Sequence, residues 1–78
     1  MKELLEYIAG SLVNNPEAVS VTEIKSEYDR SVTLELRVAK EDMGKVIGRQ
    51  GKIARTIRLI MKAAAVKANT RVQVEIVQ

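Results

Sequence analysis

Residues 31–38 alternate without exception between polar and apolar side chains. The apolar members of this run are Val32, Leu34, Leu36 and Val38. Because successive side chains of a strand point to opposite faces, the pattern predicts a strand with one buried face and one wet face. The buried face needs a second layer to cover it, so the rest of the chain must supply helices or another sheet.

Two segments show the helical spacing that such a layer requires. Near the N-terminus an apolar stripe predicts a helix that ends at Asn14-Asn15-Pro16, because a residue before proline is pushed out of the helical region. The stripe consists of Leu4, Leu5, Ile8 and Leu12. Helical spacing returns from Glu41 to Ala68, with an interruption at residues 48–51.

Two further segments, residues 18–28 and 71–77, have strand character. In the first, Ile24 breaks the alternation, which predicts a bulge or an edge strand. Residues 28–30 predict a hairpin turn into the alternating strand. The resulting order is helix-strand-strand-helix-helix-strand. We therefore expect one α+β domain spanning residues 1–78, with a three-stranded sheet and helices packed on one face.

The composition limits what such a domain can do. The 78 residues include no Cys and no His, which removes disulfides, thiol nucleophiles, zinc sites built on these residues and the usual general base near pH 7. We expect neither an enzyme nor a cofactor or metal site. No apolar run approaches the roughly 20 residues of a membrane span, and acids interrupt the N-terminal segment, so a cytoplasmic protein is expected.

The interruption at residues 48–51 has the sequence Gly48-Arg49-Gln50-Gly51, followed by Lys52. It does not fit a P-loop, because Val46 stands where a glycine is required and Ile53 where Ser or Thr should hold magnesium. It does not fit a dinucleotide fingerprint either, since neither the extra glycine nor the preceding strand is present. Two glycines that open a helix let the backbone approach a phosphate closely, so a phosphate site is predicted. The alternative is that Gly44 and Gly48 only terminate helices and bind no ligand.

The helix after this loop has three kinds of side chain on its wheel. The predicted core side consists of Ile53, Ile57, Ile60 and Ala64. Nearly opposite lies a basic stripe, formed by Arg55, Arg58 and Lys62, which either holds phosphates or is simply a solvated face. A third, apolar strip contains Leu59, Ala63 and Val66. This strip is either a protein interface or packs on the first helix.

The whole chain resembles the KH-domain family, and within it the small bacterial single-KH proteins of the KhpA group. The resemblance rests on the element order, on the Gly-x-x-Gly loop and on residues 38–48, VAKEDMGKVIG. It implies a type II KH fold that holds about four single-stranded nucleotides. It also implies self-association, pairing with the larger KH protein KhpB, also called Jag, and links to cell shape and division.

By the same resemblance, RNA would lie across the loop and along a narrow apolar groove. Ile47 and Ile53 would help form the floor of this groove, and polar groups along the second strand would meet base edges. The predicted RNA-binding residues are Lys45, Ile47, Gly48, Arg49, Gln50, Gly51, Lys52, Ile53 and Arg55.

The leading hypothesis is a non-catalytic single-stranded RNA-binding protein, acting as a post-transcriptional regulator or RNA chaperone. One alternative is a protein-interaction module that works through homodimerisation or a KhpB-like partner. Another is binding of double-stranded DNA by the two helices, which the strand-rich remainder disfavours. Glu41 and Asp42 are assigned no chemistry beyond a favourable interaction with a helix start. Tyr7 and Tyr28 are predicted to be packing residues.

Overall fold

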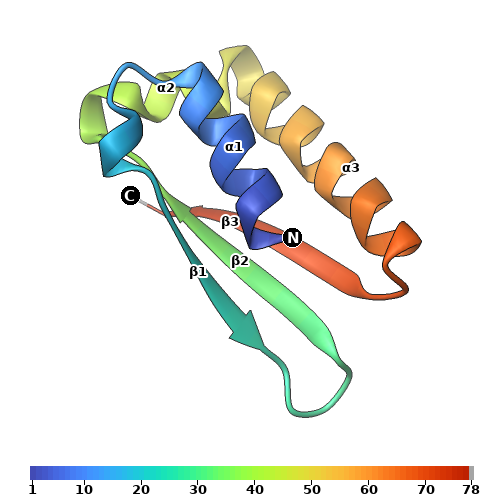
Figure 1. The fold of residues 1–78 in the computed structure, drawn as a ribbon. Coiled ribbons are helices and arrows are strands. Elements are labelled where there is room, and N and C mark those ends of the chain that lie inside the picture. The colour runs from blue at the N-terminus through green and yellow to red at the C-terminus, as the bar shows by residue number, and fades with distance from the viewer. Residues whose placement is uncertain (78) are drawn as a thin grey trace.

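The computed structural model describes residues 1–77, and its elements follow the predicted order (Figure 1). The helices are α1 (Lys2–Leu12), α2 (Met43–Ile47) and α3 (Lys52–Lys67), and the strands are β1 (Ser20–Lys25), β2 (Ser31–Arg37) and β3 (Arg71–Val77). Short 3-10 turns occupy Pro16–Ala18, Lys40–Asp42 and Arg49–Gly51. The predicted α+β class and element order are confirmed.

The three strands form one mixed sheet in the order β1-β2-β3. β2 is antiparallel to β1 and parallel to β3. The parallel pairing requires a crossover, which α2 and α3 supply, and the helices lie on one face of the sheet (Figure 1). β2 is thus the central strand, which explains why its alternation is the most regular in the sequence.

β1 is an edge strand, and the alternative of a bulge is wrong. Its residues pair one to one with β2, from Ser20 opposite Arg37 to Lys25 opposite Val32. Ile24 breaks the apolar pattern because it lies on the open face of the sheet, opposite Thr33, where its side chain is 48% exposed. The predicted hairpin between β1 and β2 is confirmed.

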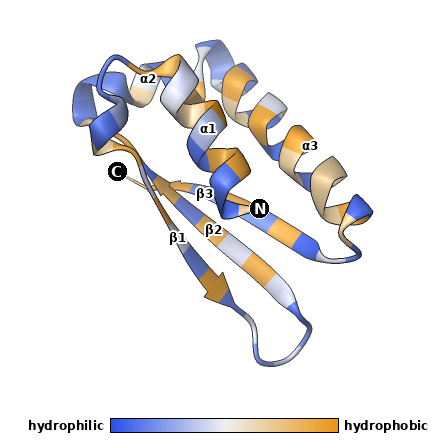
Figure 2. Cartoon of the chain, viewed as in Figure 1, coloured by the Kyte–Doolittle hydropathy of each residue, from blue (hydrophilic) through white to orange (hydrophobic). Residues whose placement is uncertain are grey.

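The core lies between the sheet and the helices (Figure 2). It is formed by Leu5, Ala9, Val21, Leu34, Leu36, Val46, Ile57, Met61 and Val74. These side chains are aliphatic apart from one methionine, as a chain without Phe or Trp requires. The prediction that the apolar face of β2 is buried is therefore confirmed, since Leu34 and Leu36 are fully buried.

The predicted core side of α3 is partly wrong. The buried residues of this helix are Ala54, Ile57, Met61 and Ala65. Of the predicted set only Ile57 is buried, whereas Ile53 and Ala64 are half-buried and Ile60 is 42% exposed. The small residues Ala54 and Ala65 face inward, and the bulky isoleucines lie at the flanks of the contact.

The prediction that both tyrosines are packing residues is also wrong. Tyr7 is 75% exposed because it lies on α1 about 200° around the helix from the buried Leu5. Tyr28 is 97% exposed in the turn between β1 and β2, a hairpin that projects beyond the helices (Figure 1).

Candidate nucleic-acid interface

The loop between α2 and α3 has a backbone that depends on glycine. Gly48 has φ 76° and ψ 175°, a region that is essentially restricted to glycine. A Cβ added at Gly48 would lie 2.6 Å from the side chain of Ile53, so this position excludes any side chain by space as well. Gly51 has φ 74°, but a Cβ there would meet no atom within 4 Å. Gly48 is therefore fixed by packing and conformation, and Gly51 by conformation alone.

The loop presents the amino end of α3 to solvent. No side chain caps this helix, although the Lys52 amide donates to the carbonyl oxygen of Arg49. Arg49, Gln50 and Lys52 surround this helix start and are all exposed. A helix start without a side-chain cap, its positive dipole end and two cations together form a site suited to a phosphate group.

A buried carboxylate holds the short helix that carries the loop. The side chain of Asp42 is fully buried, and it accepts hydrogen bonds from the backbone N–H groups of Asn14 (3.2 Å) and Asn15 (3.0 Å). The side-chain amide of Asn15 donates a third bond, also at 3.0 Å. These bonds join the end of α1 to the start of α2. The sequence pattern indicates for Asp42 only a place at a helix start, and it does not show this anchor.

The pKa of Asp42 reflects two opposed effects. Burial favours the protonated form of the carboxyl, but the hydrogen bonds from Asn15 and Asn14, together with the nearby Lys45 ammonium, outweigh it. The pKa of Asp42 is therefore lower than its ordinary value of 3.8. Asp42 is thus an anion at neutral pH.

The predicted site residues outside the loop differ in their surroundings. Lys45 Nζ lies 3.6 Å from Asp42 Oδ1, so part of its charge is neutralised by the buried anchor. Ile47 and Ile53 are half-buried on the two sides of the loop and pack against the core. Arg55 is exposed on α3, one turn beyond the loop.

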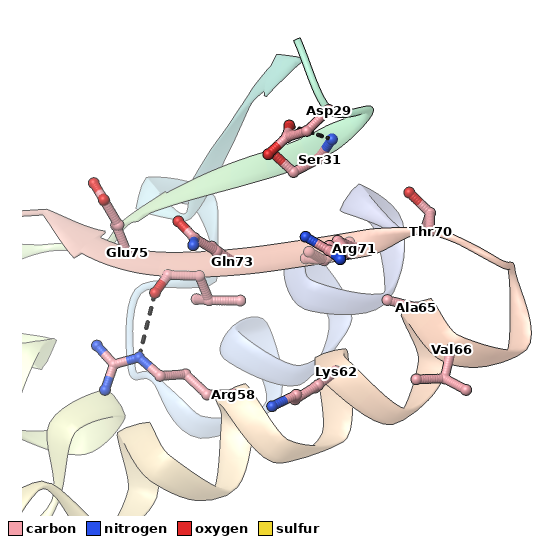
Figure 3. Close-up of a pocket in the computed structure, with 12 residues that line it drawn as sticks. Asp29, Ser31, Arg58, Lys62, Ala65, Val66, Thr70, Arg71, Gln73 and Glu75 are labelled. Atoms are coloured by element: carbon pink, nitrogen blue, oxygen red, sulfur yellow. Dashed lines mark hydrogen bonds between the residues drawn. The ribbon is translucent and has the colours of Figure 1, made fainter. Parts of the chain in front are cut away.

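A groove of about 820 Å³ lies between α3 and the edge strand β3 (Figure 3). Its lining residues are Asp29, Ser31, Arg58, Lys62, Ala65, Val66, Thr70, Arg71, Val72, Gln73, Val74 and Glu75. Arg58 crosses from helix to strand and donates a hydrogen bond from Nε to the carbonyl oxygen of Val74 at 3.3 Å. The wall of this groove is β3, and β2 contributes only Ser31, whereas the resemblance had assigned the base edges to the second strand.

The basic stripe connects the loop to this groove. Arg55, Arg58 and Lys62 follow Lys52 along α3, and the last two line the groove. Within residues 1–77 no ion pair joins any of these four cations to a carboxylate. Their charge is therefore available to a ligand.

The distribution of charge along the chain is a signal that sequence analysis missed. Residues 43–74 contain eight of the 13 Lys and Arg residues and none of the 10 carboxylates. The remaining residues therefore carry five cations and 10 acids, a net charge of −5, which hides the cationic segment in a total of +3. This segment comprises the loop, all of α2 and α3, and the first half of β3.

The apolar strip on α3 is exposed. Leu59 and Val66 are 68% and 72% exposed, and Ala63 is exposed as well. Ile60, which the sequence had assigned to the core, extends the strip. The alternative that this strip packs on the first helix is therefore wrong, and an unpartnered apolar surface remains beside the basic stripe.

Two further properties concern the part of the chain that the structure describes. No helix within residues 1–77 combines the length and the apolar character needed to cross a membrane. Nor does that range bring together three acidic side chains that could hold a metal ion.

Comparisons with known proteins show the family to which the chain belongs. A family model described as "KhpA/KhpB, KH domain" matches residues 2–76. A Clostridium acetobutylicum protein named "RNA-binding protein KhpA" is 61% identical over 77 residues, covering 99% of this chain and all of the relative. Proteins of the same name from Treponema pallidum and Listeria monocytogenes are 47% and 44% identical, covering 97% and 100% of this chain and 92% and 100% of the relatives. No solved structure matches. The chain therefore belongs to the KhpA/KhpB family of KH-domain proteins.

Proposed function

We propose that this chain binds single-stranded RNA, with the RNA backbone held at the Gly48–Gly51 loop and the bases in the adjacent groove. The observation that carries the proposal is the uncapped start of α3 behind a glycine-dependent loop, at the head of a stripe of cations that have no carboxylate partner within residues 1–77. The relatives' name, "RNA-binding protein KhpA", supports it. The KhpA/KhpB KH-domain family is non-catalytic, which confirms the prediction that the chain is not an enzyme.

In this proposal the chain is one type II KH domain that holds about four nucleotides. One phosphate lies on the amides that open α3, between Arg49 and Lys52. The next phosphates follow Arg55 and the groove cations Arg58 and Lys62. Ile47 and Ile53 would contact sugar or base beside the loop, where they are half-buried.

The bases would be held without aromatic stacking. Neither tyrosine lines the groove, and the chain has no other aromatic residue. The bases therefore rely on apolar contacts with Val72 and on hydrogen bonds at the edge strand β3. With so small a contact, one domain should bind with a dissociation constant of about a micromolar or weaker.

The proposal is tested by the double substitution Arg49→Asp/Gln50→Asp. Two carboxylates where a phosphate should lie are expected to weaken binding of a labelled, unstructured RNA by about tenfold or more, measured by fluorescence anisotropy. The slope of log affinity against log salt should also fall by about 0.7 for each phosphate that the variant no longer neutralises.

A matched control has the same change of three charges at distant exposed positions, Lys2→Asp/Thr22→Asp. It should weaken binding far less, because its carboxylates lie away from the loop. Circular dichroism of all three proteins establishes that they are folded. Equal binding by the folded loop variant and by wild type would reject the loop as the RNA site.

A second candidate function is self-association, and the exposed strip of Leu59, Ile60, Ala63 and Val66 favours it. Burial of this strip between two copies would remove exposed apolar surface from water. The name of the family, which includes KhpB, supports a KhpB-like chain as the other partner. Dimerisation would also link two weak RNA sites and so raise their joint affinity.

The self-association proposal predicts a dimer mass for wild type in sedimentation at micromolar concentration, and a monomer mass for Leu59→Glu. The fold should not change, because Leu59 is 68% exposed. Thr22→Glu, on the open face of β1, is the control and should leave the dimer intact. A monomeric wild type would exclude the homodimer. If the monomeric wild type still bound RNA, no protein partner would be needed for RNA binding.

The family resemblance also suggests the cellular setting. We place the activity in the cytoplasm, as post-transcriptional regulation or RNA chaperoning connected with cell shape and division. The resemblance alone supports this setting.

A further inference from the structure

The groove between α3 and β3 has an asymmetric charge distribution. Its α3 side contributes the cations Arg58 and Lys62, and its β3 side contributes a third cation, Arg71. Its carboxylates, Asp29 and Glu75, come from the other side. Asp29 belongs to the turn before β2, and in Figure 3 β3 lies between this turn and α3. A phosphate is attracted to the α3 side and repelled by a carboxylate. Arg71 also attracts phosphate, but the ionised Asp29 carboxylate can only accept hydrogen bonds, so an RNA group in direct contact with Asp29 must be a hydrogen-bond donor.

Asp29 is held in place before any ligand arrives. Its Oδ1 accepts hydrogen bonds from the Ser31 hydroxyl at 2.7 Å and from the Ser31 backbone N–H at 3.1 Å. Both bonds end on the same oxygen, which leaves Oδ2 with acceptor capacity. Glu75, in contrast, has no hydrogen bond to its carboxylate within residues 1–77 that would fix it.

The charge of Asp29 is also secure. The hydrogen bonds from the Ser31 hydroxyl and the Ser31 amide, together with the nearby Ser26 hydroxyl, lower the pKa of Asp29 from 3.8 to about 2. At neutral pH Asp29 is therefore fully ionised and only accepts hydrogen bonds.

A second cavity of about 500 Å³ adjoins the groove at the start of β3. It is lined by Asp29, Arg30, Val66, Asn69, Thr70 and Arg71. Asp29, Val66, Thr70 and Arg71 line both cavities, so Asp29 lies where the two join. This volume lies within the range of small-ligand sites, and a base that leaves the α3 side has room there.

We propose that Asp29 selects a nucleobase with an exocyclic amino group, by accepting a hydrogen bond from that amino group at the turn end of the groove. The proposal rests on the proposed RNA binding and adds a specificity-determining residue to it. Cytosine offers its N4 amino group to a carboxylate. Uracil has carbonyl oxygens on both sides of its only ring N–H, and these would repel the carboxylate. Asp29 should therefore favour cytosine over uracil.

The test compares short oligocytidine and oligouridine RNAs of equal length by fluorescence anisotropy at neutral pH. Both probes have the same phosphates and ribose hydroxyls, so their affinity ratio isolates the base. Wild type is expected to bind oligocytidine more tightly by on the order of fivefold, the low end for one good base contact because Asp29 is exposed.

Asp29→Asn is the informative variant because its carbonyl oxygen still accepts the Ser31 bonds that shape the turn. It should bring the ratio of affinities to about one. It should also strengthen binding to oligouridine, since a repulsive charge is removed. Glu27→Gln makes the same charge change in the same turn, at an exposed residue outside both cavities. It should leave the ratio unchanged.

The outcomes separate this proposal from the proposed function. If Arg49→Asp/Gln50→Asp weakens binding of both RNAs but wild type shows no preference for cytidine, RNA binding stands and base selection by Asp29 is rejected. The same holds if Asp29→Asn keeps the preference, or if Glu27→Gln abolishes it equally. If wild type binds neither RNA, both proposals fail.

Discussion

Gly48→Ala is expected to lower the free energy of unfolding by about 2–5 kcal/mol, a combined estimate for backbone strain and overpacking. The strain arises because alanine would have to adopt φ 76° and ψ 175°. The overpacking arises because its Cβ would lie 2.6 Å from Ile53 Cγ1 and 2.9 Å from the Ile53 backbone nitrogen. Ile53 packs against the core at the start of α3, so it has little freedom to withdraw. Chemical denaturation measures this decrease.

Two other glycines provide matched controls for that measurement. Gly51→Ala adds strain without a clash, so it should cost only about 1–2 kcal/mol. Gly44 is helical and a Cβ there meets no atom within 4 Å, so Gly44→Ala should be neutral or stabilising by up to about 1 kcal/mol. A Gly48→Ala protein as stable as Gly44→Ala would contradict the close contact with Ile53.

The sequence predicted those parts of the fold where the pattern of side chains is compatible with only one local structure. β2 is a central strand covered on one face only, and that environment produces strict alternation. The turn into β2 and the glycine loop were predictable because each depends on local backbone chemistry. Family resemblance then added the expectation that a groove lies beside the loop. Local sequence patterns do not contain this information.

The orientation of α3 was not predictable in the same way. This helix contains isoleucine, leucine, methionine, valine and alanine on most of its surface, so several faces could serve as the core side. The spacing of the bulky residues predicted that Ile60 is buried. Instead, Met61 packs against the sheet, with the small residues Ala54 and Ala65 buried beside it. Which face is buried depends on how closely α3 approaches the sheet, a tertiary property.

The missed parts of the site involve contacts between distant residues. Asp42 bonds to Asn14 and Asn15, which precede it by 28 and 27 positions, so the sequence shows only an acid near a helix start. The groove is bounded by β3 because β3 pairs parallel to β2, a topology that the element order does not determine. The cationic segment 43–74, in contrast, was visible in the sequence and was hidden only by averaging charge over the whole chain.

Asp42→Ala is expected to lower the melting temperature by on the order of 10 °C, as the removal of several buried hydrogen bonds would in a domain of this size. The substitution leaves the amides of Asn14 and Asn15 without their acceptor and releases Lys45. It should also weaken RNA binding, because α2 then has no anchor to position Gly48. Glu41→Ala is the control, since it removes the same charge from an exposed side chain.

The acid dependence of this effect separates the Asp42 carboxylate from general packing. The pKa of Asp42 is lowered by folding, so its ionised form stabilises the native state at pH values above the ordinary value of 3.8. That stabilisation disappears as the pH falls below 3.8 and through the lowered pKa, because the native carboxylate must then accept a proton. The difference in unfolding free energy between wild type and Asp42→Ala should therefore be constant from about pH 5 to 7 and shrink below about pH 4.

A difference that stayed constant down to about pH 2 would mean that the hydrogen bonds from Asn14 and Asn15 do not depend on the charge. Asp42 would then stabilise α2 and its loop through shape alone.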